Sequence, residues 1–274
     1  MPSQHHKAET FRALHARKDA FVIPNPWDPG TARMLERLGF EALATTSAGY
    51  AFSSGVQDNQ VGRDSMLKHV AEMCAATGLP VSADLENGFG DDPETVAETI
   101  RMAAAAGVVG GSIEDSIDRP GEKVYERGHA VERIRAAVAA ARALPFPFTL
   151  TARAENYLVG LPDLKDTIRR LQAYQEAGAD VLYAPGITSR EDIIAVVRSV
   201  DRPVNFLMGT QPTRFSVAEL AAMGVRRISV GSALSAAALG AFLRAAREIR
   251  DSGTFTYAKD AAGFEDVSKL LERC

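Results

Sequence analysis

The sequence has few cysteines, little net charge and no long hydrophobic run. Its two cysteines, Cys74 and Cys274, cannot build a disulfide framework, so a reducing cytoplasmic setting is expected. The formal net charge of -4 lacks the basic excess typical of nucleic-acid binding. No apolar run approaches the ~20 residues that a membrane span needs. Neither nucleic acid nor a membrane is therefore an expected partner.

Two kinds of catalytic residue are missing from the places where they would act. None of the seven lysines lies at the end of a predicted strand, which argues against a Schiff-base aldolase. Cys74 falls within a predicted helix and Cys274 is terminal, so neither is well placed as a nucleophile. The remaining candidates are acids, amides and arginines.

What the chain does contain is a regular alternation of short apolar runs and amphipathic stretches. The apolar runs predict strands at 20–25, 41–46, 80–86, 110–115, 148–155, 180–185, 203–208 and 226–231. Helical patterns separate them, at 30–38, 62–77, 93–106, 128–143, 162–177, 189–199, 216–223 and 232–250. Asp92-Pro93 and Leu161-Pro162 are predicted helix starts, because proline suits the first helical turn.

Eight β-α units without a break in composition predict an α/β fold, a single (β/α)8 TIM-type barrel over residues 1–274. The barrel core is expected at about residues 20–250, with extra helices at 3–18 and at the C-terminal DVSKLLERC. A doubly wound open sheet is the alternative. It usually has fewer strands, and no G-x-G-x-x-G motif follows the first predicted strand.

Charged and amide side chains gather where the predicted strands end, which in such barrels is the site of catalysis. These residues are Asp84, Glu86, Glu114, Asp115, Arg153, Glu155 and Asn205. Unpaired charge is costly in an interior strand unless several acids converge on a hard cation with oxygen ligands. The pattern predicts a Mg²⁺ site, with Mn²⁺ as a substitute, and a bidentate grip of Arg153 on a substrate carboxylate. Helix caps or structural ion pairs are the alternative for each single acid.

The strings TTSAGYAFSSGVQD, SADLENGFGD, GSIEDS and TARAE, in this order, resemble the isocitrate lyase/phosphoenolpyruvate mutase superfamily. The resemblance covers about residues 20–245 and implies roles for individual residues. It implies substrate binding by Thr46, Ser47, Ala48, Gly49, Arg153 and Asn205, metal binding by Asp84, Glu86 and Glu114, and catalysis by Asp58, Arg153 and His129. It also implies that the eighth barrel helix, near 232–250, is exchanged with a partner in a homodimer or homotetramer.

Three departures from the family pattern bear on the reaction. Glu86 replaces the second aspartate of the metal motif D-x-D. Arg127 stands where the lyases carry a catalytic cysteine, although Gly128-His129 is kept, and Ala184 stands where they carry a glutamate. The asparagine-containing signature of the phosphonate mutases is absent as well. These differences argue against cysteine-dependent isocitrate lyase chemistry.

The expected function is that of a Mg²⁺-dependent enzyme for a small 2-oxo or 2-hydroxy carboxylate, similar to oxaloacetate or 2-oxoglutarate. Such an enzyme cleaves a C–C bond next to the carbonyl through a metal-stabilised enolate, by decarboxylation, retro-aldol cleavage or hydrolysis. A phosphonomutase-type isomerase acting on a P–C bond and a non-catalytic 2-oxo acid binding barrel are the alternatives. Residues 116–129, with glycines near both ends, are expected to form a lid.

Overall fold

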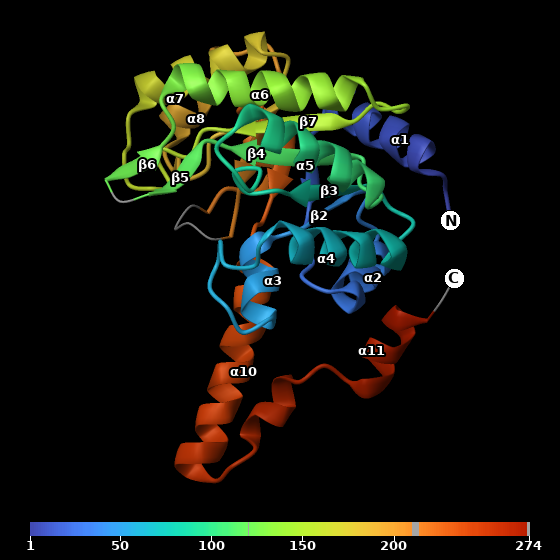
Figure 1. Ribbon diagram of the computed structural model, residues 1–274. Coiled ribbons are helices and arrows are strands. Elements are labelled where there is room, and N and C mark those ends of the chain that lie inside the picture. The colour runs from blue at the N-terminus through green and yellow to red at the C-terminus, as the bar shows by residue number, and fades with distance from the viewer. Residues whose placement is uncertain (120, 210–213, 273–274) are drawn as a thin grey trace.

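The computed structural model describes residues 1–119, 121–209 and 214–272, and its centre is a parallel sheet curled into a barrel (Figure 1). The strands are β1 (Phe21–Ile23), β2 (Leu43–Ala44), β3 (Val81–Asp84), β4 (Gly110–Glu114), β7 (Thr149–Arg153), β8 (Val181–Tyr183), β9 (Val204–Leu207) and β10 (Arg227–Ser229). They pair in the order β1-β10-β9-β8-β7-β4-β3-β2. The Ala44 amide donates to the Pro24 carbonyl at 3.1 Å, which joins the two edges. The predicted (β/α)8 barrel is confirmed, and each predicted strand contains an observed one.

Helices follow the strands and cover the outside of the barrel (Figure 1). They are α1 (Gln4–Ala16), α2 (Pro29–Arg37), α3 (Ser47–Ser53), α4 (Arg63–Ala76), α5 (Pro93–Ala105), α6 (Arg127–Arg142), α7 (Leu164–Glu176), α8 (Arg190–Arg198), α9 (Val217–Ala222), α10 (Ala233–Ser252), the 3₁₀ helix η1 (Thr256–Asp260) and α11 (Phe264–Leu271). None of the helices in the described part of the chain is long and apolar enough to cross a membrane.

Helix caps explain one correct and one wrong prediction of a helix start. Asp92 caps α5 and Pro93 is its first residue, as predicted. The predicted start at Leu161-Pro162 is wrong, because α7 begins at Leu164. There the Asp163 carboxylate accepts a hydrogen bond from the Asp166 amide at 3.0 Å. A carboxylate that satisfies a free helix-end amide fixes the start more firmly than a nearby proline does.

The inside of the barrel is polar, and this positions the site. On β7, Leu150 and Ala152 belong to the main hydrophobic core beneath the helices. Side chains alternate along a strand, so Thr149, Thr151 and Arg153 face the barrel axis. Thr151 is completely buried there and accepts a hydrogen bond across the barrel. The barrel interior is thus a hydrogen-bonded space that opens into a cavity at the C-terminal strand ends.

Helix α1 closes the opposite end of the barrel. Phe11 and Leu14 of this helix pack in one cluster with Phe21, Ala42 and Val109. The last three stand at or just before the start of a strand, so the cluster marks the N-terminal end of the barrel. The helix predicted at 3–18 is therefore confirmed.

The segment predicted as a lid contains structure that the sequence pattern did not indicate. β5 (Ser116–Arg119) and β6 (Glu122–Val124) pair as an antiparallel hairpin that follows β4. The end of the predicted lid, 127–129, is the first turn of α6. A short hairpin with alternating charges is hard to distinguish from a loop by composition.

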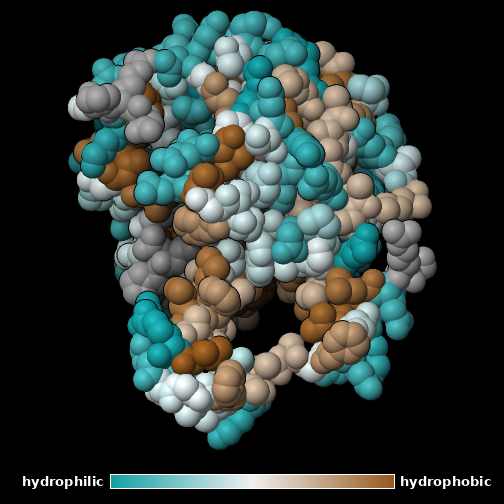
Figure 2. Space-filling view, turned by 60° about the horizontal axis from the view of Figure 1, so that its bottom comes forward, coloured by the Kyte–Doolittle hydropathy of each residue, from teal (hydrophilic) through white to brown (hydrophobic). Residues whose placement is uncertain are grey.

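Helix α10 projects away from the barrel, and the chain returns through η1 and α11 toward α2 (Figure 1). Large apolar side chains are exposed on this arm, among them Leu239 at 39%, Phe242 at 65% and Phe264 at 88%. Figure 2 shows apolar side chains bordering a hollow between the arm and the barrel. In a single copy of the chain, α10, η1 and α11 therefore leave an apolar surface exposed.

Candidate active site

A cavity of about 350 Å³ opens where the strands end. Most of the predicted site residues line it, namely Thr46, Ser47, Ala48, Asp58, Asp84, Arg153 and Asn205. They come from β3, β7 and β9 and from the segment between β2 and α4, so distant parts of the sequence meet here. The convergence expected from the barrel topology is present.

Asp84, the last residue of β3, is held from two sides. Its Oδ2 accepts hydrogen bonds from the Ser47 amide at 3.2 Å and the Ser47 hydroxyl at 2.9 Å. Its Oδ1 lies 2.9 Å from Arg153 Nη1. Its own amide donates to Thr45 Oγ1 at 2.9 Å, which fixes the strand end beside α3. Asp84 thereby joins the start of α3 to the guanidinium on β7.

Arg153, the last residue of β7, is surrounded by carboxylates. Its Nη1 lies 3.0 Å from Glu114 Oε2 as well as near Asp84, and its Nε donates to Glu155 Oε1 at 2.8 Å. The guanidinium carbon lies 5.1 Å from the centre of the Tyr183 ring. Among the described residues no partner is found for Nη2, which leaves that nitrogen available to a ligand in the cavity.

Negative charge accumulates at the mouth of this cavity. Burial, followed by repulsion from Asp84, Asp58 and Glu114, raises the pKa of Glu86 to about 8. Burial and then the charge of Asp84 raise the pKa of Asp58, although a hydrogen bond with Ser47 opposes the shift. Burial also raises the pKa of Glu114, against the attraction of Arg153. One arginine does not neutralise so many acids.

Glu86 shows most clearly that a positive group fits here. It is 7% exposed, and its Oε1 is buried without a hydrogen-bond partner in the described part of the chain. Its backbone is left-handed, with φ 50°, so the chain turns to hold this side chain at the strand end. An orphaned carboxylate oxygen among other acids fits a divalent cation.

The described residues do not, however, gather three or more acids, histidines or cysteines around one point. Arg153 stands between Asp84 and Glu114 and holds both. Magnesium keeps several of its waters and uses few direct protein ligands. The donor set therefore fits a hydrated cation with one or two direct carboxylate contacts rather than an all-protein cage.

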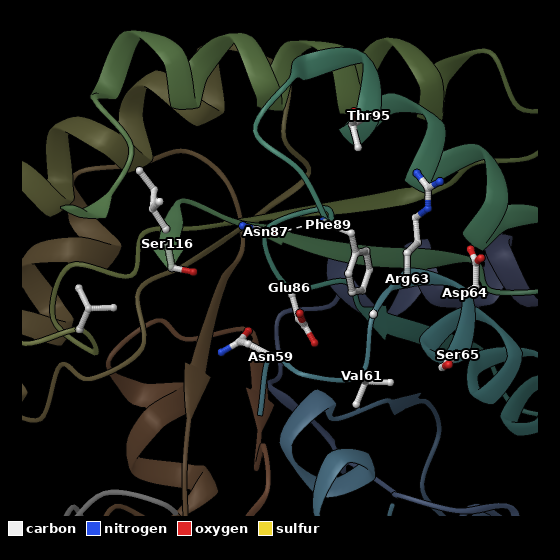
Figure 3. Close-up of a pocket in the computed structure, with 13 residues that line it drawn as sticks. Asn59, Val61, Arg63, Asp64, Ser65, Glu86, Asn87, Phe89, Thr95 and Ser116 are labelled. Atoms are coloured by element: carbon white, nitrogen blue, oxygen red, sulfur yellow. Dashed lines mark hydrogen bonds between the residues drawn. The ribbon is translucent and has the colours of Figure 1, made fainter. Parts of the chain in front are cut away.

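A second, wider cavity of about 820 Å³ is lined by Glu86 and residues of the neighbouring segments (Figure 3). Figure 3 shows Glu86 pointing toward Asn59, with Ser116 of the hairpin and Arg63 of α4 on the walls. Asp58 and Asp84 line the inner cavity. Asn59 directly follows Asp58 in the chain, and Glu86 lies two residues after Asp84. Residues close together in the chain thus line the two cavities, and Ser116 and Ile117 of β5 border the wider one.

Three predicted site residues, Gly49, Glu114 and His129, line neither cavity, although Glu114 pairs with Arg153. His129 is in the first turn of α6, where its Nε2 is 2.9 Å from the Asp91 carbonyl oxygen. Gly49 has a structural role in the first turn of α3. A Cβ at this position would come within 2.6 Å of Thr46 Cγ2. The structure does not bring His129 to the substrate cavity.

Asp115, at the same strand end as Glu114, has a structural role. Its Oδ1 accepts the Glu155 amide at 2.8 Å, and its Oδ2 pairs with Arg170 and with the Tyr174 hydroxyl. The alternative of a structural ion pair therefore holds for this acid. Glu155 itself is buried against Arg153, with its pKa raised to about 8 by burial.

Sequence reasoning missed several cavity residues, including Tyr183, Arg227 and Ser229. Tyr183 and Ser229 are hydrogen-bonded, and Ser229 also accepts from Asn205 Nδ2 at 2.9 Å. A signal was present in the sequence, because Arg227 and Ser229 are polar at every second position of a predicted strand, as Thr149, Thr151 and Arg153 are.

A cavity lined by acids and an arginine at the C-terminal strand ends lies where TIM-barrel enzymes carry their active sites. The phosphoenolpyruvate phosphomutase family model matches residues 11–250, and the chain belongs to this family, within the isocitrate lyase/phosphoenolpyruvate mutase superfamily. The resemblance seen in the sequence is confirmed.

Several relatives show how widely the family's chemistry varies. A lyase/mutase-group protein of Burkholderia cenocepacia J2315 is 64% identical, with a TM-score of 0.96 over 98% of this chain and 97% of its own. Oxaloacetate decarboxylase of Chromohalobacter salexigens is 30% identical over 91% of this chain and 88% of its own. Oxaloacetate acetylhydrolase in complex with its product oxalate is 29% identical, with a TM-score of 0.87 over 98% of this chain and 95% of its own.

Proposed function

We propose that this protein is a Mg²⁺-dependent enzyme that cleaves a C–C bond next to the carbonyl of an oxaloacetate-like 2-oxo acid. The observation that carries the proposal is the buried, partnerless Oε1 of Glu86 among the acids that surround Arg153. Burying that oxygen unpaired is costly, and a divalent cation would remove the cost. The proposed metal residues are Asp84, Glu86 and Glu114.

The size of the inner cavity and the nature of the relatives support a small substrate. A volume of about 350 Å³ is at the low end for ligand pockets and suits a short carbon chain. Two relatives act on oxaloacetate by their names, one as a decarboxylase and one as an acetylhydrolase. A 2-oxo acid with four or five carbons is therefore the proposed substrate class.

The residues of the chain then have separate tasks. A bound divalent cation supplies Lewis-acid polarisation of the substrate oxygens. Arg153 lines the cavity and is the proposed group that stabilises negative charge developing on the carbonyl oxygen as the bond breaks. Asp58, which lines the cavity and whose pKa is raised by burial and then by the charge of Asp84, is the proposed acid–base residue. The β5–β6 hairpin excludes water from the site.

One experiment tests the function and separates its variants. The protein is incubated with oxaloacetate and Mg²⁺, and the products are followed by ¹³C NMR against a sample with EDTA and a protein-free sample with Mg²⁺. Pyruvate formed faster than in the protein-free sample identifies a decarboxylase, and acetate with oxalate identifies a hydrolase. No Mg²⁺-dependent turnover of oxaloacetate or of a panel of other 2-oxo acids would contradict the proposal and favour a binding barrel.

Phosphonomutase chemistry is a second candidate, because the matching family model is that of phosphoenolpyruvate phosphomutase. Phosphonopyruvate also has a 2-oxo acid moiety that the same cavity could hold. Adding it to the panel, with ³¹P NMR as the readout, decides between P–C and C–C cleavage.

A further inference from the structure

Arg227, the first residue of β10, lies inside the barrel at the floor of the inner cavity. It is 5% exposed and lines the cavity that Asp84 and Arg153 border at the mouth. Its Nε donates to Asn205 Oδ1 at 2.8 Å and its Nη2 donates to Thr151 Oγ1 at 3.0 Å. Both of these partners are neutral.

The third contact of the guanidinium is also with a neutral group. Its Nη1 lies 3.5 Å from His15 Nε2 on α1. Burial, followed by the charge of Arg227, lowers the pKa of His15 to about 3, so this histidine carries no charge at neutral pH. Three uncharged contacts orient the Arg227 guanidinium without balancing its charge.

No carboxylate among the described residues pairs with Arg227. Burial lowers its pKa to about 10; the Tyr183 phenol opposes this shift and the charge of Arg153 adds to it. The group therefore remains a cation at neutral pH. A buried cation without a counter-ion is strongly unfavourable unless an anion joins it.

The mouth of the cavity is a poorer place for a free anion. The Arg153 guanidinium is already in contact with Asp84, Glu114 and Glu155, which leaves only its Nη2 for a ligand. The acids there repel a free carboxylate except at the metal. Ser82, Ser112 and Ser229 line the wall between mouth and floor with hydroxyl groups.

The spacing suits a short diacid. Thr151 and Arg153 both face inward on β7, two residues apart, which is roughly 6–7 Å along a strand. Arg227 is bonded to Thr151, so mouth and floor are separated by about this rise. A ligand with two carboxylates joined by a short carbon chain would place one at each end.

We propose that Arg227 forms an anion subsite at the cavity floor, which binds the carboxylate of a 2-oxo diacid that lies away from the metal. This inference rests on the proposed function and narrows its substrate class to dicarboxylates. Arg227 then acts as a specificity-determining residue that distinguishes oxaloacetate-like substrates from pyruvate-like ones.

The test compares pyruvate with 3,3-difluorooxaloacetate, which carries a second carboxylate and two fluorines in place of the three methyl hydrogens. Their affinities for the Mg²⁺-loaded protein are measured by calorimetry for the parent, Arg227→Met and Arg227→Lys. Arg227→Met should weaken diacid binding about tenfold or more, the value of a charged hydrogen bond, and leave pyruvate within about twofold. Arg227→Lys should keep part of the diacid preference because it keeps the charge.

A matched control is the adjacent Arg226, which directly precedes β10 and does not line the cavity. Arg226→Met should change neither affinity. Unfolding curves for each variant establish that it is folded under the conditions of the titration.

Several outcomes would overturn the inference. One is a diacid affinity that Arg227→Met leaves unchanged. Another is an equal loss for both ligands, since Arg227 would then only support the barrel. A third outcome concerns formate as a probe of the cavity floor. If formate binding depends on Arg227 but the diacid does not displace formate, Arg227 belongs to a separate anion site. A parent protein that binds neither ligand with Mg²⁺ would refute the proposed function itself, and the subsite with it.

Discussion

Acidification should destabilise the barrel through His15, a buried histidine that must stay neutral. The ring is 8% exposed and packs edge-on against Phe11 and Phe21. Its Nδ1 lies 2.8 Å from the Phe11 carbonyl oxygen, so this nitrogen carries the hydrogen and Nε2 faces Arg227 as an acceptor. Protonating Nε2 would place a second positive charge against that guanidinium inside the barrel.

The size of the effect follows from the shift in pKa. Burial first, and Arg227 second, lower the pKa of His15 from 6.5 to about 3. Since the folded-state pKa is depressed, the stability from neutral His15 is present above the unfolded pKa near 6.5. It is lost as the pH falls from there toward 3. Between pH 7 and pH 5 the loss is about 2 kcal/mol, because each pH unit below the unfolded pKa costs about 1.4 kcal/mol.

The assay compares the free energy of unfolding in urea at pH 7 and pH 5 for the parent and His15→Gln. Glutamine keeps a neutral donor and acceptor, so the variant should lose about 2 kcal/mol less than the parent over this interval. His5→Gln is the control, because the His5 side chain is 59% exposed and should leave the pH dependence unchanged. Identical pH dependence in the parent and His15→Gln would refute the argument.

Four further predictions concern the site and the assembly. Asp84→Ala should abolish Mg²⁺ binding in calorimetry, and an unchanged affinity would remove Asp84 from the metal site. Arg153→Lys keeps the charge but loses the planar fork, so oxalate should bind about tenfold more weakly or worse. If Arg153→Lys binds oxalate as tightly as the parent does, Arg153 is not the residue that holds the carboxylate. Hydrogen exchange in 116–125 should slow when Mg²⁺ and oxalate are both bound, and equal protection with and without ligand would exclude a closing lid. We propose that the apolar face of α10 is covered by a second copy, so light scattering should give at least twice 29.4 kDa for the parent and a smaller assembly for Phe242→Asp. A parent mass of 29.4 kDa would contradict this assembly.

The sequence predicted the barrel well because each strand is bounded by local signals. Short apolar runs between amphipathic stretches recur at a regular spacing, and they need no knowledge of long-range contacts to be seen. Helix α3 was missed because Ser47–Ser53 is too short to show a helical period. The β5–β6 hairpin was missed because its short, charged strands give little alternation to read.

The candidate site was predictable only as far as strand ends define it. Asp84 and Arg153 stand at the last position of a strand, and the barrel topology alone brings them together. The sequence could not show which acid is paired with another residue and which has an oxygen without a hydrogen-bond partner. Asp115 and Glu86 both come shortly after a buried strand. Asp115 is paired with Arg170 and Tyr174, whereas Oε1 of Glu86 has no hydrogen-bond partner in the described part of the chain.

The charges inside the barrel are sorted along its axis, and this ordering links the site to the proposed substrate. Acids dominate the mouth, where Arg153 is shared among them, and an unbalanced cation stands at the floor. A cation bound at the mouth and a carboxylate bound at the floor would correct both imbalances at once. With a metal-bound monocarboxylate at the mouth, the cation would offset the acids there, but Arg227 would remain without a counter-ion. The electrostatics of the barrel therefore favour a metal-bound diacid over a metal-bound monoacid.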